Sequence, residues 1–297
     1  MELTKVNGKS ALIFAATNTL IYAFKNKEAL LVDTSAGNSE LKSKVELLAE
    51  LGLRPKHIVL SHNHHDHLGG INALRKAYPG IITYTSAGEK VFCENPDIYR
   101  SFLSSSSPIN TSRLQNYEIK IDLVLQPGLI KLNDEKFKII HLPGHAPDQI
   151  GIITPDKVCH VGDAVFSEDI LSKYSLPYLY DVAAAMTTLS YLQTISADFF
   201  VLGHATKIYN QLEFKSLVLL NMQQIELYLT TILELLERPA TREELLTVLA
   251  ELFHLEMETI QYYIYLATVS SFLTYLLNIN KVANMVENGK LYFFNLP

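Results

Sequence analysis

The densest group of chemically active side chains is the segment Ser61-His62-Asn63-His64-His65-Asp66-His67-Leu68-Gly69-Gly70. Imidazole and carboxylate groups are the ligands that Zn²⁺ and related divalent metals prefer. The apolar run 58–60 predicts a buried strand before the segment, and the apolar spacing of 68–78 predicts a helix after it. We therefore expect a strand-to-helix loop in which His62 and His64 face one metal, and Asp66 and His67 a second. The alternative is a histidine-rich surface loop.

Three later segments each end in a histidine or an aspartate. His145 ends Leu142-Pro143-Gly144-His145, Asp163 ends His160-Val161-Gly162-Asp163, and His204 ends Val201-Leu202-Gly203-His204. Each of these residues follows an apolar, strand-like run and a glycine that lets the chain turn sharply at the strand end. Four other histidines lie beside these residues or in strands, and we expect them to have packing or supporting roles: His57, His65, His141 and His160.

The pattern His-x-His-x-Asp-His followed by Gly-Gly resembles the signature of the metallo-β-lactamase superfamily of hydrolases, and the three later segments follow in the order that this family requires. The resemblance covers about residues 1–210 and implies a four-layer αββα sandwich. It also implies two divalent metal ions, the first held by His62, His64 and His145 and the second by Asp66, His67 and His204, with Asp163 bridging them. Asn18 and Asp33 also match the family and are expected to brace the loops beneath the metals.

The implied chemistry is hydrolysis, because two adjacent divalent ions lower the pKa of a shared water until hydroxide exists at neutral pH. Asp66 and Asp163 are the candidate catalytic carboxylates. His64 stands where oxygen-reducing diiron relatives carry a glutamate, so zinc is the expected metal, with iron or manganese as alternatives. Asp163 separates the chain from the antibiotic-hydrolysing branch, which lacks it.

The substrate is open between several interpretations. Hydrolysis of a thioester or other acyl ester, as in hydroxyacylglutathione hydrolases (glyoxalase II), is preferred, and a small-molecule substrate is expected. The alternatives are a lactonase, a phosphodiesterase or nuclease, an iron enzyme that oxidises a persulfide, and a metal-binding module without turnover. Residues 166–180 should border the cleft, with Tyr174 and Tyr178 as candidate substrate contacts or as aromatics that cover the C-terminal region.

Composition and periodicity indicate a mixed α/β protein. The chain has 297 residues, a net charge of −6, and two cysteines, which give no disulfide framework. The N-terminal residues resemble no signal peptide, which predicts a cytoplasmic protein. The irregular segment 86–116 is expected to form a partly helical flap over the site, with a solvated insertion as the alternative. Strands are predicted at 11–15, 19–24, 29–32, 81–85, 130–132, 137–141, 150–153, 158–161 and 199–202, and helices at 39–52, 68–78 and 181–195.

Residues 211–297 differ in character from residues 1–210, which predicts a second domain. A long helix (212–237), a helix opened by a capping box of Thr241 and Glu244, two short helices (257–266 and 269–278) and a hairpin resemble a winged helix. This region has five basic and ten acidic residues, which argues against nucleic acid binding. The stretch between Glu258 and Lys281 is uncharged but contains too many polar residues for a membrane span. We expect a cleft wall or a homodimer surface instead.

Overall fold

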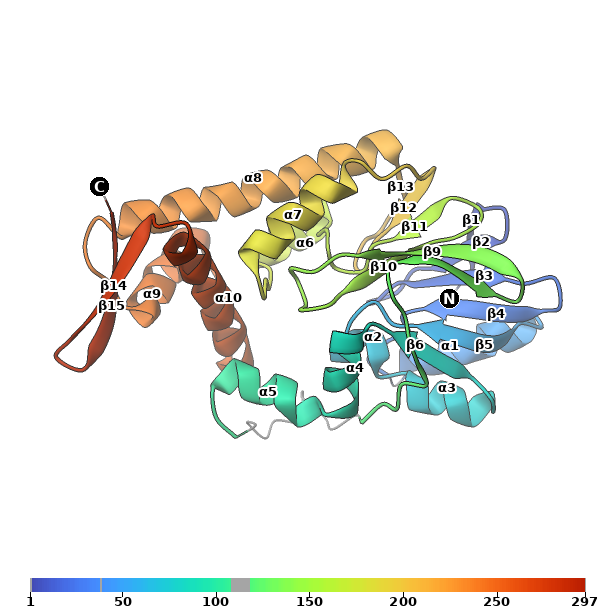
Figure 1. Ribbon diagram of the computed structural model, residues 1–297. Helices are drawn as coiled ribbons and strands as arrows, with labels where there is room; N and C mark the ends of the chain where they lie inside the picture. Colours follow the sequence, from blue (N-terminus) through green and yellow to red (C-terminus); the bar gives the residue numbers. More distant parts are fainter. Residues whose placement is uncertain (1, 38, 108–117, 297) are drawn as a thin grey trace.

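The computed structural model describes residues 2–37, 39–107 and 118–296. Two β-sheets face each other, with helices on both outer sides (Figure 1). The first sheet has seven strands in sequence order: β1 (Thr4–Asn7), β2 (Ser10–Ile13), β3 (Thr19–Ala23), β4 (Glu28–Val32), β5 (Arg54–Val59), β6 (Ile82–Thr85) and β7 (Leu123–Val124). The second has the order β13 (Tyr209–Asn210), β12 (Phe199–Val201), β11 (Val158–His160), β10 (Ile150–Ile153), β9 (Glu135–His141) and β8 (Gly128–Leu132).

Both sheets are mixed. In the first, β1 to β4 pair antiparallel and β4 to β7 pair parallel. In the second, only β11 and β12 pair in parallel. The predicted strands are confirmed. The short strands β1, β7 and β13 were not predicted, because two to four residues are too few to show an alternating apolar pattern.

Three apolar layers hold the sandwich together. Alternate residues of one strand point to opposite faces, so Leu30 lies between the two sheets while Leu31 packs toward the outer helices α1 (Ser39–Glu50) and α3 (Ile71–Ala77). On the other sheet, Phe200 and Leu202 pack toward α7 (Val182–Leu192) and α8 (Gln211–Leu235). The order helix, sheet, sheet, helix confirms the predicted αββα architecture.

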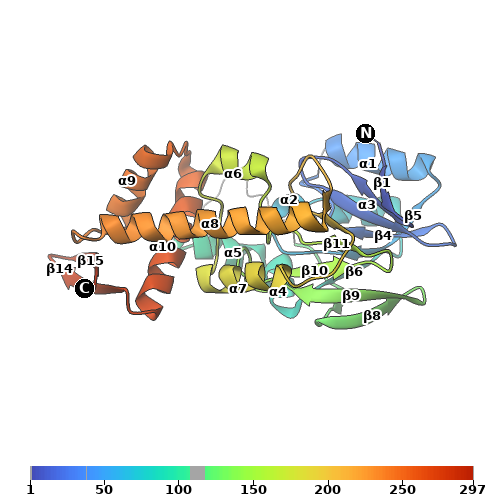
Figure 2. The same ribbon diagram turned by 90° about the horizontal axis from the view of Figure 1, so that it is seen from above.

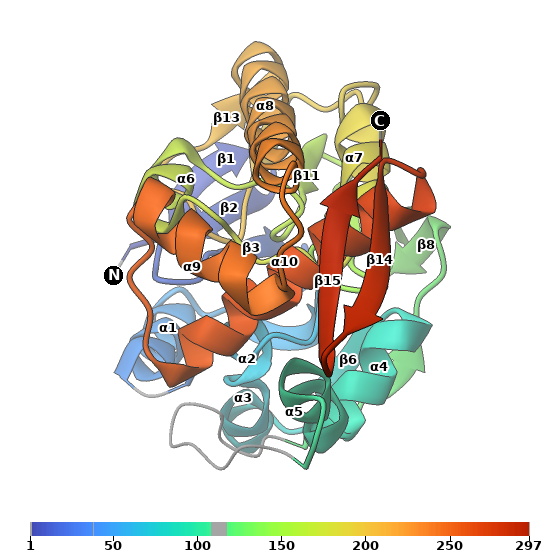
Figure 3. The ribbon, with the colours of Figure 1, turned by 90° about the vertical axis from the view of Figure 1, so that its left-hand side faces the viewer.

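The C-terminal region contains α9 (Arg242–Phe253), α10 (Thr259–Asn278), β14 (Val282–Glu287) and β15 (Lys290–Asn295), which face the viewer in Figure 3. The capping box is present, since Thr241 and Glu244 bond each other's backbone N–H groups. The winged-helix interpretation itself stays a prediction.

One prediction in this region is wrong: a single helix, α10, replaces the two short helices predicted at 257–266 and 269–278. Polar residues suggested a break in the helix. The helix continues through them because the hydroxyls of Thr268 and Ser270 donate hydrogen bonds to backbone carbonyls one turn earlier. The hydroxyls of Thr268 and Ser271 also accept bonds from the backbone of Leu179 and Val182. No helix in the described parts of the chain is long and apolar enough to cross a membrane.

Helix α8 connects the sandwich to the C-terminal region, and Figure 2 shows it running along both. Its buried residues Phe214 and Val218 pack with Phe200, and its later residues Leu229 and Ile232 share the same apolar cluster with α9 and α10. A division at residue 210 stays a prediction, but the segments on its two sides share one core.

Candidate metal centre

The seven predicted ligands all lie where strands end. The segment after β5 carries His62 and His64, and the short helix α2 (His65–Leu68) carries Asp66 and His67. The predicted helix at 68–78 corresponds to α3, which begins later, at Ile71; Gly69 and Gly70 separate it from the additional short helix α2. The other ligands follow strands of the second sheet: His145 after β9, Asp163 after β11 and His204 after β12.

The structure brings these side chains together. Their ligand atoms form three overlapping groups, each with all atoms within 4.8 Å: His62, His64 and His145; His62, His67 and Asp163; Asp66, His67 and His204. Asp163 is central, because its Oδ2 lies 3.4 Å from the Nε2 atoms of His67 and His204 and 3.6 Å from that of His145. One carboxylate oxygen thus reaches both the group around His145 and the group around His204.

Each of the five histidines has one ring nitrogen fixed by the scaffold, which leaves the other facing the cluster. The partners are the Ser61 hydroxyl for His62 (2.9 Å), the Tyr99 hydroxyl for His64 (2.9 Å), the Asp33 carboxylate for His67 (2.8 Å), the Tyr178 carbonyl for His145 (2.9 Å) and the Ala16 carbonyl for His204 (2.6 Å). Such outer hydrogen bonds set the orientation of imidazoles that bind metals. His64 presents Nδ1 to the cluster, and the other four present Nε2.

Burial lowers the pKa of His62, His64 and His145, but the field near the carboxylates favours positive charge on the other two histidines. Burial opposes a charge on the His67 imidazole, but the carboxylates of Asp163, Asp66 and Asp33 raise its pKa to about 10. Burial likewise opposes a charge on His204, whereas Asp163 and Asp66 raise its pKa to about 12. Carboxylates that stabilise a positive charge on imidazole this strongly also attract metal cations.

The donor set fits divalent metal ions. His62 Nε2, His67 Nε2 and Asp163 Oδ1 are buried and have no hydrogen-bond partner among the described residues. Leaving a buried polar atom unsatisfied costs about 1–3 kcal/mol, and ligation would remove that cost. A mixture of imidazole and carboxylate donors suits zinc, iron and manganese.

Two glycines allow the ligands to approach. Gly162 precedes Asp163 with φ +55°, a left-handed conformation that glycine adopts without strain. A Cβ on Gly203 would lie 2.1 Å from Asp163 Oδ1 and 2.7 Å from His67 Cε1, so no larger residue fits there without moving a ligand.

The structure confirms the bracing role predicted for Asn18 and Asp33. Asp33, fully buried, accepts hydrogen bonds from the Ser61 backbone and hydroxyl, besides its bond to His67. Asn18 donates to the carbonyls of Leu202 and Ala205, on either side of His204.

The remaining histidines stay outside every candidate group that the described residues form. His57 bonds the Tyr84 hydroxyl between the sheets, and His141 bonds Asp148. His160 is buried with Nε2 3.8 Å from Asp33. His65 lines the cavity described below.

Three supporting residues carry no sequence signal of their role, because each reaches the site from a distant segment. Tyr99 bonds His64 from α5 (Pro96–Ser104), and Thr17 donates to Asp66 Oδ2. Glu89, on α4 (Ala87–Glu94), accepts from the Asn63 backbone and side chain and from the Asp148 backbone.

A cavity of about 640 Å³ opens onto the cluster. Tyr174, from α6 (Glu168–Tyr174), and Tyr178 both line it, as the sequence predicts. Helices α4 and α5, which lie in the predicted flap, contribute Phe92, Tyr99 and Arg100; the flap's residues 108–116 lie outside the described residues. The C-terminal helix α10 contributes Gln261 and Ile264, so this region forms part of the cleft wall.

Comparison with known proteins now decides the family. The model of the metallo-beta-lactamase superfamily matches residues 13–204, which include all seven candidate ligands. The chain belongs to this superfamily. Solved metallo-beta-lactamase folds agree: a family protein of Thermus thermophilus has a TM-score of 0.75 at 22% identity, covering 94% of both chains. A beta-lactamase domain protein of Burkholderia ambifaria has a TM-score of 0.72 at 14% identity, covering 99% of this chain and 94% of its own.

Curated superfamily relatives carry enzyme names. Hydroxyacylglutathione hydrolase GloC of Haemophilus influenzae is 31% identical over 147 residues, which are 48% of this chain and 64% of that protein. The hydroxyacylglutathione hydrolase of Blochmanniella pennsylvanica is 28% identical over 148 residues, which are 50% of this chain and 46% of that protein. The chain thus spans about half to two thirds of the length of these relatives.

Proposed function

We propose that this chain is a dinuclear metal-dependent hydrolase, and that its substrate is a small molecule with a thioester or other acyl ester bond. One observation carries the proposal: the Oδ2 atom of Asp163 lies within 3.6 Å of ligand nitrogens from both groups. A carboxylate in that position would bridge two ions. His62, His64 and His145 would hold the first, and Asp66, His67 and His204 the second.

The ions, when bound, supply an acidified water and polarise the carbonyl group of the substrate. The residues of the chain position these components. Asp66 is the candidate for orienting the attacking water, since its Oδ2 is held by Thr17 and lies 3.0 Å from His204 Nε2. Zinc is the proposed metal, because nitrogen donors predominate in the set.

The cavity supports a small acyl substrate with an anionic part. Its volume of about 640 Å³ is in the range of small-molecule sites. Arg100 and Lys173 lie on its wall and could attract a carboxylate, while Tyr174 and Tyr178 could stack against the substrate. The names of the hydroxyacylglutathione hydrolases support a thioester in particular. The excess of acidic residues in 211–297 argues against nucleic acid as a partner.

Metal content and turnover test the proposal. Protein purified without chelator should contain two metals per chain and should hydrolyse a hydroxyacyl-glutathione thioester in preference to an acyl lactone or a bis-aryl phosphodiester. Asp163→Ala should lose metal and thioester turnover together, because it removes the bridging oxygen. If the protein hydrolyses only the phosphodiester, the proposed substrate class changes from acyl esters to phosphodiesters. If it contains a single iron and hydrolyses none of these substrates, the proposed hydrolase function is refuted.

A further inference from the structure

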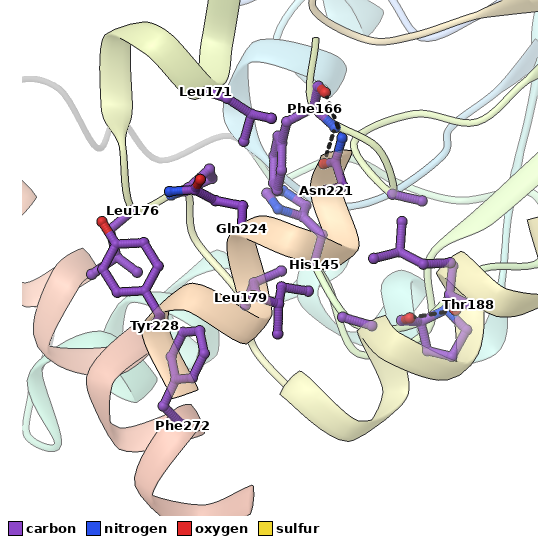
Figure 4. A pocket seen from close by; sticks show the side chains of 16 residues that line it. His145, Phe166, Leu171, Leu176, Leu179, Thr188, Asn221, Gln224, Tyr228 and Phe272 are labelled. Carbon is purple, nitrogen blue, oxygen red and sulfur yellow. Dashed lines mark hydrogen bonds between the residues drawn. The ribbon is translucent and has the colours of Figure 1, made fainter. Parts of the chain in front are cut away.

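A second, smaller cavity lies beside His145 of the metal cluster and is lined by helices of both regions (Figure 4). It shares His145, Phe166, Leu176 and Pro177 with the large cavity, so these four residues form a wall common to both cavities. Its free volume is about 30 Å³, room for about two water molecules.

The wall of this inner cavity is apolar, with side chains such as Leu179, Leu189, Ile225 and Phe272. Its polar residues are mostly occupied elsewhere. Asn221 bonds both the N–H and the carbonyl of Phe166, as the dashed lines in Figure 4 show. Gln224 donates to the carbonyl of Ser175, and Thr188 to that of Pro143.

Tyr228 is the exception. It is only 1% exposed, and its hydroxyl is buried with no hydrogen-bond partner among the described residues. Figure 4 shows its side chain extending from α8 along the cavity wall. Tyr228 lies seven residues beyond Asn221, which is about 10 Å along the helix. A buried donor without a partner costs free energy, and an acceptor on a ligand would remove that cost.

We propose that the inner cavity binds the acyl end of the substrate, and that this acyl group is short, apolar and carries an oxygen that accepts a hydrogen bond from Tyr228. The centre of the Phe166 ring lies 5.6 Å from that of His145, and Phe166 lines both cavities. In a bound substrate, its ring would therefore lie between the ester carbon and the acyl tail. This inference rests on the proposed acyl ester substrate and adds which acyl groups are accepted.

Binding of product acids tests the inference without turnover. The purified metal-containing protein is titrated calorimetrically with acetate, butanoate, hexanoate, octanoate and 5-oxohexanoate. Each methylene that leaves water should tighten binding roughly fourfold. The gain should continue for two or three methylenes beyond acetate and then stop, because the cavity is full. Affinity that is independent of chain length would overturn the proposal.

Two variants locate the effect. Leu189→Phe should fill the cavity and abolish the gain with chain length while acetate binding stays unchanged; Leu219→Phe, on the exposed side of α8, is its control. Tyr228→Phe removes one oxygen and should erase the preference for 5-oxohexanoate over hexanoate, roughly two- to tenfold. Tyr191→Phe, an exposed tyrosine, should keep that preference.

The outcomes separate this inference from the proposed function. The protein could bind longer acids more tightly, lose this gain in Leu189→Phe, and yet hydrolyse no thioester. That result would support acyl binding in the inner cavity and refute the proposed thioester hydrolysis. If Leu189→Phe does not fold, Tyr228→Phe decides, since a retained preference for the oxo acid would refute the role of Tyr228 and of this cavity.

Discussion

Single side chains beyond the ligands decide how rigid the centre is. Glu89 is fully buried, and burial raises the pKa of its carboxyl group although the Asn63 amide and two backbone N–H groups bond it. Asn63 stands between His62 and His64, and Asp148 follows His145 by three positions. Glu89 therefore ties together the segments that carry all three candidate ligands of the first metal.

Replacing Glu89 by glutamine should loosen the first metal. The glutamine amide nitrogen cannot accept a hydrogen bond from the N–H groups that face it, so the segment of either Asn63 or Asp148 must move. We expect metal affinity to fall about tenfold or more, as for other outer partners of ligands. Competition with a chromogenic chelator measures this. The control is Glu94→Gln, because Glu94 lies on the same helix and its carboxylate accepts a hydrogen bond from the backbone of Ile121. Equal metal affinity in Glu89→Gln and in this control would contradict the role of Glu89 in holding the ligand segments.

The supporting residues also show what the sequence could predict about the site. The candidate ligands His62, His64, Asp66 and His67 fall in one local motif at a strand end, so residue type and spacing were enough to nominate them; His145, Asp163 and His204 were nominated only because the resemblance to the superfamily requires further ligands from later segments. Glu89, Tyr99 and Thr17 lie in unrelated segments, and only the folded chain brings them to Asn63, His64 and Asp66. Their roles depend on tertiary contacts that have no local pattern.

At the scale of elements, helix α5 is held over the cavity by one residue in particular. The hydroxyl of Tyr99 bonds His64 and is also hydrogen-bonded to Tyr178, and α5 contacts α10. No residue of α5 is fully buried, so apolar packing anchors this helix only weakly. The helix should therefore depend strongly on the Tyr99 hydroxyl.

Tyr99→Phe should release α5 without unfolding the protein. The ring keeps its packing, but the bonds to His64 and Tyr178 are lost, which costs about 1 kcal/mol or more. Hydrogen exchange of residues 96–104 should become several times faster, while exchange in α7 stays unchanged. Tyr180→Phe, an exposed tyrosine nearby, should leave both rates as they are. Unchanged exchange in Tyr99→Phe would show that other contacts hold the helix.

The capping box of α9 gives a second prediction for an element. Thr241→Ala removes the side-chain acceptor for the Glu244 N–H and should lower the free energy of unfolding by about 1 kcal/mol. Urea denaturation measures the change. Thr247→Ala on the same helix is the control, because its hydroxyl donates to the carbonyl of Glu243 in the interior of the helix and not at its start. A loss equal to that of the control would contradict the capping role.

Helix α10 shows where element prediction fails. Its polar residues suggested a break in the sequence, but they are satisfied by carbonyls of the same helix and by the loop 179–182. Whether a polar residue ends a helix or anchors a neighbouring segment depends on that neighbour, which the local sequence does not contain.

For the whole molecule, the predicted homodimer needs an exposed surface. The uncharged stretch that suggested the dimer offers little exposed surface, because Tyr265, Phe272 and Leu276 are buried in the chain's own core. The outer face of α8 remains, with Leu212 76% and Leu219 50% exposed. We expect a dimer in gel filtration that Leu219→Glu converts to a monomer. Wild-type protein that elutes as a monomer would remove the prediction.

Metal ions should also stabilise the fold as a whole, because the ligands come from both sheets. The segments with His62 to His67 extend from the first sheet, and those with His145, Asp163 and His204 extend from the second, so bound ions would cross-link the two layers. Without ions, the buried carboxylate of Asp163 would have only histidines to neutralise it. A ligand present at 100 times its Kd stabilises the native state by roughly 2.7 kcal/mol per site.

Dialysis against a chelator should therefore lower Tm by several degrees, and added zinc should restore it. A domain of this size shifts by roughly 2–4 °C for each kcal/mol, so two sites predict a shift of about 10 °C or more. In Asp163→Ala the response to zinc should be much smaller, since the shared ligand is absent. A Tm that does not change when metal analysis confirms removal would mean that the two sheets hold the ligands in place by themselves.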